Sequence, residues 1–344
     1  FTSKHNLFLL GGALAVAGSL AVQDEAGKTI IMSMDPHEHI VGVLEATRGS
    51  DGDTFGRGVE AATALIVPLA SADDTTQPSS SAFANARKLA QSGVSAALVE
   101  SLRVLWNEAE KDNENANEIG NKRVATVTCQ LCTGIKLLAA NDEICKELVQ
   151  ELALLDLLFV VLKSSLADDV SAGVMASAMA LLRQMMASDH VKHALHTAAF
   201  ISIASNNLQM YIDETYAPAA DPGNKVLEHT LGAVSALCLR YPEASESVVD
   251  SGCAQLIISA MQVAIDRKDA ETAGATVATG APAPAVGKPL RQGCMAVRNI
   301  ASRSPHVREV LRSYEAVRVI ENCKVAAKSA CTDVGDAAIR DVTN

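Results

Sequence analysis

A repeated pattern of short, capped apolar segments is the feature that most constrains the fold of this chain. Four segments can be laid over one another, at 141–152, 188–199, 241–252 and 304–315. Each begins with a polar or proline-containing cap and continues with two apolar residues four positions apart. These pairs are Ile144/Leu148, Val191/Leu195, Ala244/Val248 and Val307/Leu311. Because residues four apart share one face of an α-helix, each segment is predicted to form a short helix with one buried stripe.

Two longer apolar segments follow each short one. The second segments lie at 152–162, 200–211, 253–265 and 317–327, and the third at 171–187, 224–239, 290–301 and 334–342. A fainter unit occupies 83–140, and a partial repeat with helices near 36–47 and 59–70 precedes it. The pattern predicts about five units of three helices each, with no sheet.

A short capped helix followed by two longer buried ones is the plan of armadillo repeats, whose length is about 40–47 residues. The resemblance is clearest in QGCMAVRNIASRSPHVREVL at 292–311, where AVRNIASRSP corresponds to the end of the family's third helix. The chain resembles the armadillo family over roughly 36–342. The resemblance implies an all-α, right-handed solenoid, and it is specific to architecture and not to one function.

The sequence predicts an apolar N-terminal extension at 1–27 before a solenoid at 28–344. Loop insertions are expected at 71–82, 206–224 and 268–289, because their composition offers few large apolar residues to build a core. Residues 7–22 carry no charge, but as a helix they would span roughly 24 Å, less than the ~30 Å core of a bilayer. Three roles stay open for 7–22: docking on a partner protein, a membrane contact, or packing on the chain's own solenoid.

Composition argues against several classes of function. Hydrophobic residues make up 49% of the chain and aromatics only 3%, so Ala, Leu and Val supply the apolar mass, as is typical of packed helices. A net charge of −11 with one Trp and four Tyr disfavours nucleic-acid binding, which needs cations and stacking rings. The eight cysteines mostly lie in apolar helical segments, which favours reduced thiols in a reducing or matrix-like compartment.

No motif of an enzyme or a cofactor site is apparent. Cys129 and Cys132 have a metal-site spacing, but no second pair follows at the distance of a zinc site. His190, His193 and His196 recur every third residue, and we interpret them as surface histidines. We therefore expect no catalytic residue, no cofactor, no metal and no small-molecule substrate.

The groove lined by third helices is the expected binding surface, because armadillo proteins hold extended peptides there. Counting eight positions back from the first apolar residue of each short helix gives Lys136, Arg183, Ala236 and Asn299. In the import adaptors of the family that this chain resembles, Asn and Trp recur along the third-helix ladder. Only Asn299 matches that pattern here, which argues against binding of basic localisation signals. Lys136, Arg183 and Asn299 are the candidate partner-binding residues. The two cations favour an acidic segment, and the alternative is that both are solvated surface charges.

Two functional hypotheses follow. The first is a structural scaffold subunit of a large assembly, bound to other protein subunits. In size and Ala-rich helical style the chain looks like the extra peripheral-stalk subunits of algal mitochondrial ATP synthases, which resist rotary torque; no motif carries that resemblance. It implies a location at the matrix side of the inner membrane. The alternative is a cytoplasmic armadillo adaptor that binds an acidic peptide in its third-helix groove.

Overall fold

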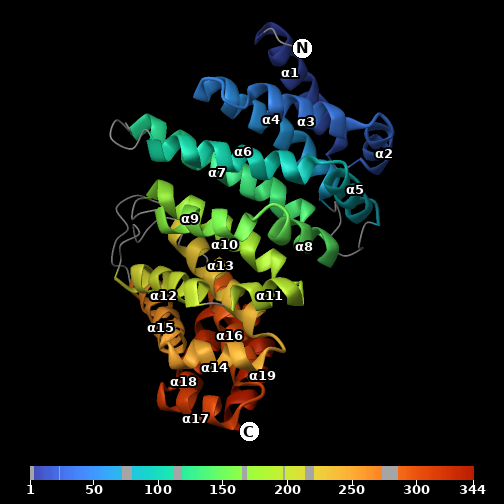
Figure 1. The fold of residues 1–344 in the computed structure, drawn as a ribbon. Helices are drawn as coiled ribbons and strands as arrows, with labels where there is room; N and C mark the ends of the chain where they lie inside the picture. The colour runs from blue at the N-terminus through green and yellow to red at the C-terminus, as the bar shows by residue number, and fades with distance from the viewer. Residues whose placement is uncertain are drawn as a thin grey trace. The chain divides into compact units, whose positions relative to one another are not determined.

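The computed structural model describes residues 4–22, 24–71, 80–111, 118–164, 169–196, 198–213, 221–272 and 286–344. Within these ranges the regular structure is helical and no strand occurs. The chain divides into two compact units, 1–161 and 162–344. Figure 1 shows the helices, coloured along the chain. The central parts of the three expected insertions, at 72–79, 214–220 and 273–285, lie outside the described residues.

The first unit contains eight helices and most of a ninth among its described residues. They are α1 (Lys4–Ala21), α2 (Glu25–Ser33), α3 (Pro36–Thr47), α4 (Gly52–Ala70), α5 (Ser80–Gln91), α6 (Val94–Lys111), α7 (Glu118–Leu138), α8 (Asp142–Gln150) and α9 (Leu154–Ser164). The second unit contains α10 (Asp169–Met185), α11 (Asp189–Leu195), α12 (Ala198–Ile212), α13 (Asp221–Cys238), α14 (Pro242–Asp250), α15 (Cys253–Thr272), α16 (Gly287–Ala301), α17 (Pro305–Ser313), α18 (Ala316–Ala327) and α19 (Thr332–Thr343).

In chain order the helices group by threes from α2 onwards, with a short first helix opening most groups. Six such triplets run from α2 to α19 in the part of the chain that the structure describes, where the sequence predicted about five. The first triplet is α2–α4, of which the sequence predicted α3 and α4 as a partial repeat. Its first helix was not recognised because its buried positions are Lys28 and Met32, so that helix has no apolar pair of the repeating kind.

The four predicted first helices are confirmed as α8, α11, α14 and α17. All eight residues of the apolar pairs are buried. Two of the four N-cap side chains form capping hydrogen bonds: Asn141 accepts from the backbone N–H of Ile144 at 2.9 Å, and Ser304 accepts from that of Val307 at 3.5 Å. Ser188 and Tyr241 precede α11 and α14 without a side-chain capping bond. α14 and α17 have proline in the first helical turn. Proline has no backbone N–H, so it leaves no donor without an acceptor there.

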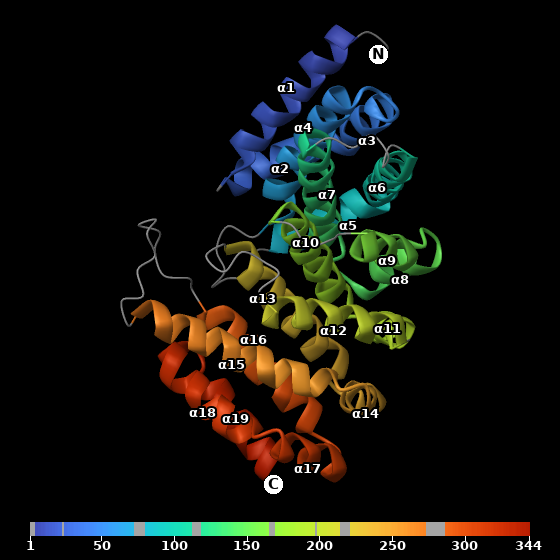
Figure 2. The same ribbon diagram turned by 90° about the vertical axis from the view of Figure 1, so that its left-hand side faces the viewer.

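The apolar segment 7–22 lies in α1, which packs on its own unit through one face. α1 contacts α3 and α4, and it runs along α4 in Figure 2. Leu14 and Ala21 are buried, whereas Leu9, Val16 and Leu20 remain 58–65% exposed. The inner face of α1 therefore behaves as part of the solenoid. The expected boundary between 27 and 28 falls inside α2.

The helices beside all three expected insertions extend further than the sequence indicated, and α5 already begins at Ser80 inside 71–82. α12 runs to Ile212 and α13 begins at Asp221, so parts of 206–224 are helical. α15 runs to Thr272 and α16 begins at Gly287, so both ends of 268–289 are helical. Tertiary contacts hold these ends: the Arg267 guanidinium lies 4.4 Å from the ring centroid of Tyr211 and donates to its carbonyl at 2.8 Å.

Candidate functional site

The third helices of successive triplets pack on one another within each unit. In the first unit α1 contacts α4 and α4 contacts α7; in the second α10 contacts α13, α13 contacts α16, and α16 contacts α19. α1 thus holds the place of a third helix. We call the ladder α10–α13–α16–α19 the third-helix ladder of the second unit. It carries two of the three predicted partner-binding residues.

Asn299 on α16 is used inside the ladder. Its side-chain nitrogen donates to the backbone carbonyl of Ser235 on α13 at 2.9 Å and lies 3.0 Å from the Ser235 hydroxyl. Both amide hydrogens therefore have acceptors on the neighbouring helix. The side-chain oxygen of Asn299, Oδ1, is the atom that remains for a partner, and it can only accept a hydrogen bond.

Arg183 on α10 lies across a notch in the next third helix. A Cβ at Gly232 of α13 would lie 2.8 Å from Cδ of Arg183 and 2.9 Å from its Nε and Nη1 atoms. The absence of a side chain at Gly232 thus makes room for the arginine. Arg183 is half-buried and has no hydrogen bond or ion pair with any residue that the structure describes. A cation held by packing alone is available for an external anion.

Lys136, the third predicted residue, belongs to α7 of the first unit. It is half-buried and has no hydrogen bond or ion pair among the described residues. Lys136 and Arg183 belong to separate compact units.

The sequence count missed the ladder position on α19. In GCMAVRNIA and GDAAIRDVT, at 293–301 and 335–343, Asp341 corresponds to Asn299. Nε of Arg298 on α16 lies 3.3 Å from a carboxylate oxygen of Asp341. Counting back from a following short helix could not find Asp341, because 344 is the last residue of the sequence. Self-alignment of the third helices would have found it.

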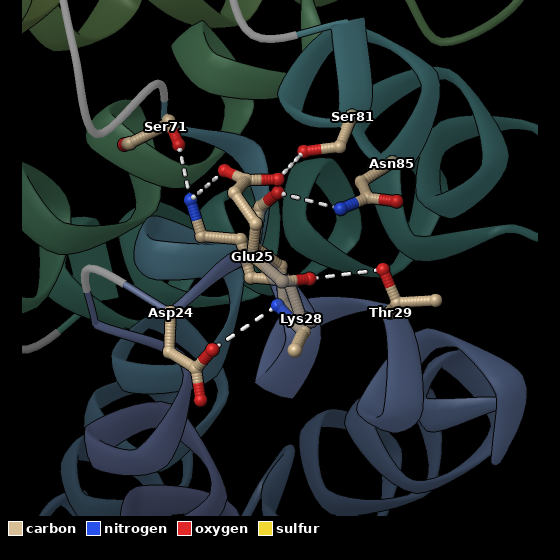
Figure 3. A network of polar contacts seen from close by, with 9 residues as sticks. Asp24, Glu25, Lys28, Thr29, Ser71, Ser81 and Asn85 are labelled. Atoms are coloured by element: carbon tan, nitrogen blue, oxygen red, sulfur yellow. Dashed lines mark hydrogen bonds and ion pairs between the residues drawn. The ribbon is translucent and has the colours of Figure 1, made fainter.

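Lys28, a buried lysine on α2, is a second candidate functional residue that the sequence did not predict. Lys28 is fully buried, and its Nζ atom lies 3.0 Å from a carboxylate oxygen of Glu25 and 3.0 Å from the backbone carbonyl of Ser71 (Figure 3). The Glu25 carboxylate also accepts from the Ser81 hydroxyl. Ser71 follows the end of α4, so the ammonium satisfies a carbonyl that the helix itself leaves without a partner.

The same arrangement recurs in the second unit. Lys192 on α11 is buried, and its Nζ atom lies 2.9 Å from Asp189 and 3.2 Å from the carbonyl of Leu239, just beyond α13. In both cases an acidic residue precedes the lysine by three positions in a first helix. The recurrence indicates a structural capping device and not a catalytic lysine. An acid followed three residues later by Lys was the available sequence signal.

We expect the Asp189–Lys192 ion pair to make a contribution to stability that depends on pH. The hydrogen bond from Lys192 lowers the pKa of Asp189 below its usual 3.8. The stabilisation is therefore present above about pH 3.8 and is lost as the pH falls through the lowered, folded-state pKa. Because Asp189 is 84% exposed, we expect Asp189→Asn to cost at most about 1 kcal/mol at neutral pH. Urea unfolding should show that this difference shrinks at acidic pH; a difference independent of pH would contradict the assignment.

The histidine cluster is built around one hydroxyl. His193 Nδ1 and His196 Nδ1 each lie 2.9 Å from the Tyr241 hydroxyl, and His196 Nε2 lies 2.9 Å from the Ser247 hydroxyl. These contacts join α11 to α14. Among the residues that the structure describes, no group of three or more His, Cys, Asp or Glu side chains is arranged to hold a metal ion.

The cysteines are free thiols, and seven of the eight are buried. Burial raises the pKa of Cys238 to about 12 and that of Cys253 to about 11. Burial likewise raises the pKa of Cys132 in the 129–132 motif. Thiols that stay protonated at neutral pH are weak nucleophiles and weak metal ligands. The cysteines therefore have the character of core residues.

Comparisons with known proteins identify a fold. No family model and no curated protein matches the sequence. Among solved structures, an engineered protein matches with a TM-score of 0.59 and 14% identity over 88% of this chain and 98% of its own. A designed armadillo repeat protein matches with a TM-score of 0.57 and 14% identity over 88% and 99% of the two chains. A third, a designed armadillo repeat protein in complex with peptide (KR)4, matches with a TM-score of 0.54 and 13% identity over 88% of this chain and 99% of its own.

These matches cover most of the chain and accord with the six triplets and the stacked third helices within each unit. No single helix in the described part of the chain is long and apolar enough to cross a membrane; the bent pair 242–250 and 253–270 passes that test by length and composition only. By its fold, this chain is an armadillo-like α-solenoid.

Proposed function

We propose that the chain is a non-catalytic scaffold that binds other proteins, and that Arg183 receives a carboxylate of an acidic peptide segment. The observation that carries the proposal is the cation of Arg183, held over Gly232 with no counter-ion among the described residues. An arginine fixed by packing loses less entropy when it binds, and its planar guanidinium suits a carboxylate.

The charge of the site decides the sign of the partner. The designed armadillo repeat protein solved with peptide (KR)4 is a precedent for this fold in complex with a strongly charged segment. Here Arg183 is a cation without a counter-ion among the described residues, and the amide hydrogens of Asn299 are already committed to Ser235. The Arg183 cation favours an acidic segment over a basic one, whereas the Asn299 side-chain oxygen can bind only an N–H or O–H donor of the partner.

Peptide binding tests the proposal directly. A fluorescent oligo-glutamate peptide should bind the intact chain, and Arg183→Ala should weaken that binding about tenfold, the loss expected for one charge-assisted hydrogen bond. Gly232→Ala should also weaken it, because the new Cβ displaces the Arg183 side chain without changing any charge. Fluorescence anisotropy at constant ionic strength measures both effects.

Lys288→Ala provides the matched control, because Lys288 is an exposed cation of the second unit, at the start of α16. Its removal changes the net charge as Arg183→Ala does but leaves the notch intact. Equal losses for Arg183→Ala and Lys288→Ala would show a diffuse charge effect and would contradict the site. Binding unaffected by Gly232→Ala would contradict the role of the notch.

The setting of the scaffold is a separate hypothesis. We propose a permanent structural subunit, with the peripheral stalk of a mitochondrial ATP synthase as the assembly and the matrix side of the inner membrane as its place. Its support is the resemblance in size and Ala-rich helical style. A permanent subunit should co-purify with its endogenous complex at fixed stoichiometry through high salt, whereas an adaptor held by Arg183 should be stripped. Native mass spectrometry of that complex distinguishes the two.

A further inference from the structure

Cys129 on α7 differs from the other cysteines because its side chain is partly exposed, whereas the remaining seven are buried. The residues Thr126, Cys129, Thr133 and Lys136 follow one another at steps of three and four positions, and none of them is buried. Residues at these steps share one face of a helix. Cys129 therefore lies in the middle of an open stripe along α7.

Cys132 provides a second thiol one helical turn from the first, and it is fully buried. In a helix, Cα atoms three residues apart are about 5 Å from each other, which is within the range of a disulfide. Their Cβ atoms are about 5–6 Å apart, whereas a disulfide needs about 3.5–4.5 Å. The bond between Cys129 and Cys132 can thus close when α7 tightens locally, and a bond strained in this way is readily reduced again.

The difference in exposure gives the two thiols different roles. Only Cys129 can meet a reagent from solvent while the chain stays folded. Burial raises the pKa of Cys132, and so does the neighbouring Cys129, whereas the Lys136 ammonium acts in the opposite direction. Cys132 is therefore a weak nucleophile toward external reagents, but its attack on Cys129 is intramolecular and has a high effective concentration.

The charges along the same stripe suit an anionic reagent. Lys122 and Lys136 lie seven residues before and after Cys129, which is two helical turns, so both belong to the same side of α7. Residues 119–141 contain no Asp or Glu. A small disulfide that carries carboxylates, such as glutathione disulfide, is therefore attracted to the stripe.

We propose that Cys129 and Cys132 form a reversible dithiol site that exchanges with an anionic low-molecular-weight disulfide. The Cys129 thiolate attacks one sulfur of the small disulfide, forms a mixed disulfide and releases one small thiolate. The Cys132 thiolate then attacks Sγ of Cys129, closes the protein disulfide and releases the second small thiolate. The two cysteine protons pass to the released thiolates, so the protein is oxidised and the small disulfide is reduced. The site belongs to the first unit and does not depend on the peptide site at Arg183.

Incubation of the folded, full-length chain with glutathione disulfide tests the site. After acid quenching, alkylation in denaturant and tryptic digestion, residues 124–136 form one peptide that contains both cysteines and no other. Mass spectrometry should show that this peptide loses both alkylation sites together and regains them after treatment with dithiothreitol. Cys294 and Cys331 are the matched control, because their thiols also interact with each other but are fully buried. We expect Cys129 and Cys132 to be oxidised about tenfold faster than this control pair, or more, since the control pair reacts only when the structure opens.

Two variants separate the steps of the exchange. Cys132→Ala should stop the reaction at the mixed disulfide and retain one glutathione on Cys129. Cys129→Ala should leave Cys132 fully open to alkylation, because no exposed thiol then begins the exchange. A wild-type chain that keeps glutathione on Cys129, or whose 124–136 peptide stays fully alkylated, would overturn the proposal. Oxidation of Cys294 and Cys331 at the same rate would also overturn it, because exposure would then not decide which thiols react.

Discussion

Replacing Gly18 by alanine should loosen α1 from the rest of the first unit. A Cβ at Gly18 would lie 2.8 Å from the backbone carbonyl carbon of Ala64 and closer still to its oxygen, so the atom that must move is main chain of α4. Overpacking of this kind costs about 1–3 kcal/mol. Because α1 is the end of its ladder, we expect the cost to appear as faster hydrogen exchange of α1 amides, with the amides of α7 unchanged.

Gly12→Ala is the matched control on the same helix. Gly12 has no atom within 4 Å of its ideal Cβ, so the alanine meets nothing. Alanine is the better helix former by about 0.5–1 kcal/mol, and α1 amides should exchange more slowly in this variant. Faster exchange of the α1 amides in Gly18→Ala together with slower exchange in Gly12→Ala would establish the close contact between α1 and α4. Equal protection in both variants would mean that α1 is not docked as described.

Loss of the carboxylate beside the buried Lys28 should destabilise the first unit more than loss of the lysine itself. Glu25→Ala removes the Glu25 carboxylate from beside a fully buried ammonium, and breaking a buried ion pair in this way typically costs about 3–5 kcal/mol. Because Glu25 is 47% exposed and water screens its charge, we expect about 2–3 kcal/mol. Lys28→Met removes the charge together with its need for a partner. It leaves the Ser71 carbonyl without the ammonium hydrogen bond, a loss that costs about 1–2 kcal/mol.

The double variant Glu25→Ala/Lys28→Met completes the cycle. If the glutamate acts through the lysine, the double variant should be no less stable than Glu25→Ala alone, and urea unfolding measures all four chains. The conservative Lys192→Met in the second unit should behave like Lys28→Met, since both lysines satisfy a carbonyl at the end of a third helix. Strictly additive losses would contradict the capping role.

The sequence predicted the units that repeat strongly, and of the first triplet it predicted α3 and α4 but missed α2. An Asn or Ser cap and an apolar pair four apart locate α8 and α17 without tertiary information, because caps and amphipathic stripes are local properties. α2 escaped notice because its buried position is occupied by Lys28, and a lysine is read as exposed unless its partners are known. Those partners, Glu25 and the Ser71 carbonyl, include one that is 43 residues away in the chain.

The candidate site shows the same division. Counting from the repeats located Arg183 and Asn299 on third helices. The two side chains differ in whether the neighbouring helix binds their polar groups. Asn299 is engaged by Ser235, whereas Arg183 lies over Gly232 without a hydrogen bond or ion pair among the described residues. Neither relation follows from position in a repeat, because each depends on the side chain that the adjacent helix carries.

The sequence by itself determined that this chain is all helical, that its helices come in threes with short capped first members, and which residues form their buried stripes. Periodicity and caps are encoded within a few residues, so they survive without knowledge of the fold. Only the tertiary structure decided that α1 is a third helix with one face on α4 and the other uncovered. An apolar segment such as 7–22 has the same composition whether its faces meet protein or solvent, and contact with a distant helix is what distinguishes them.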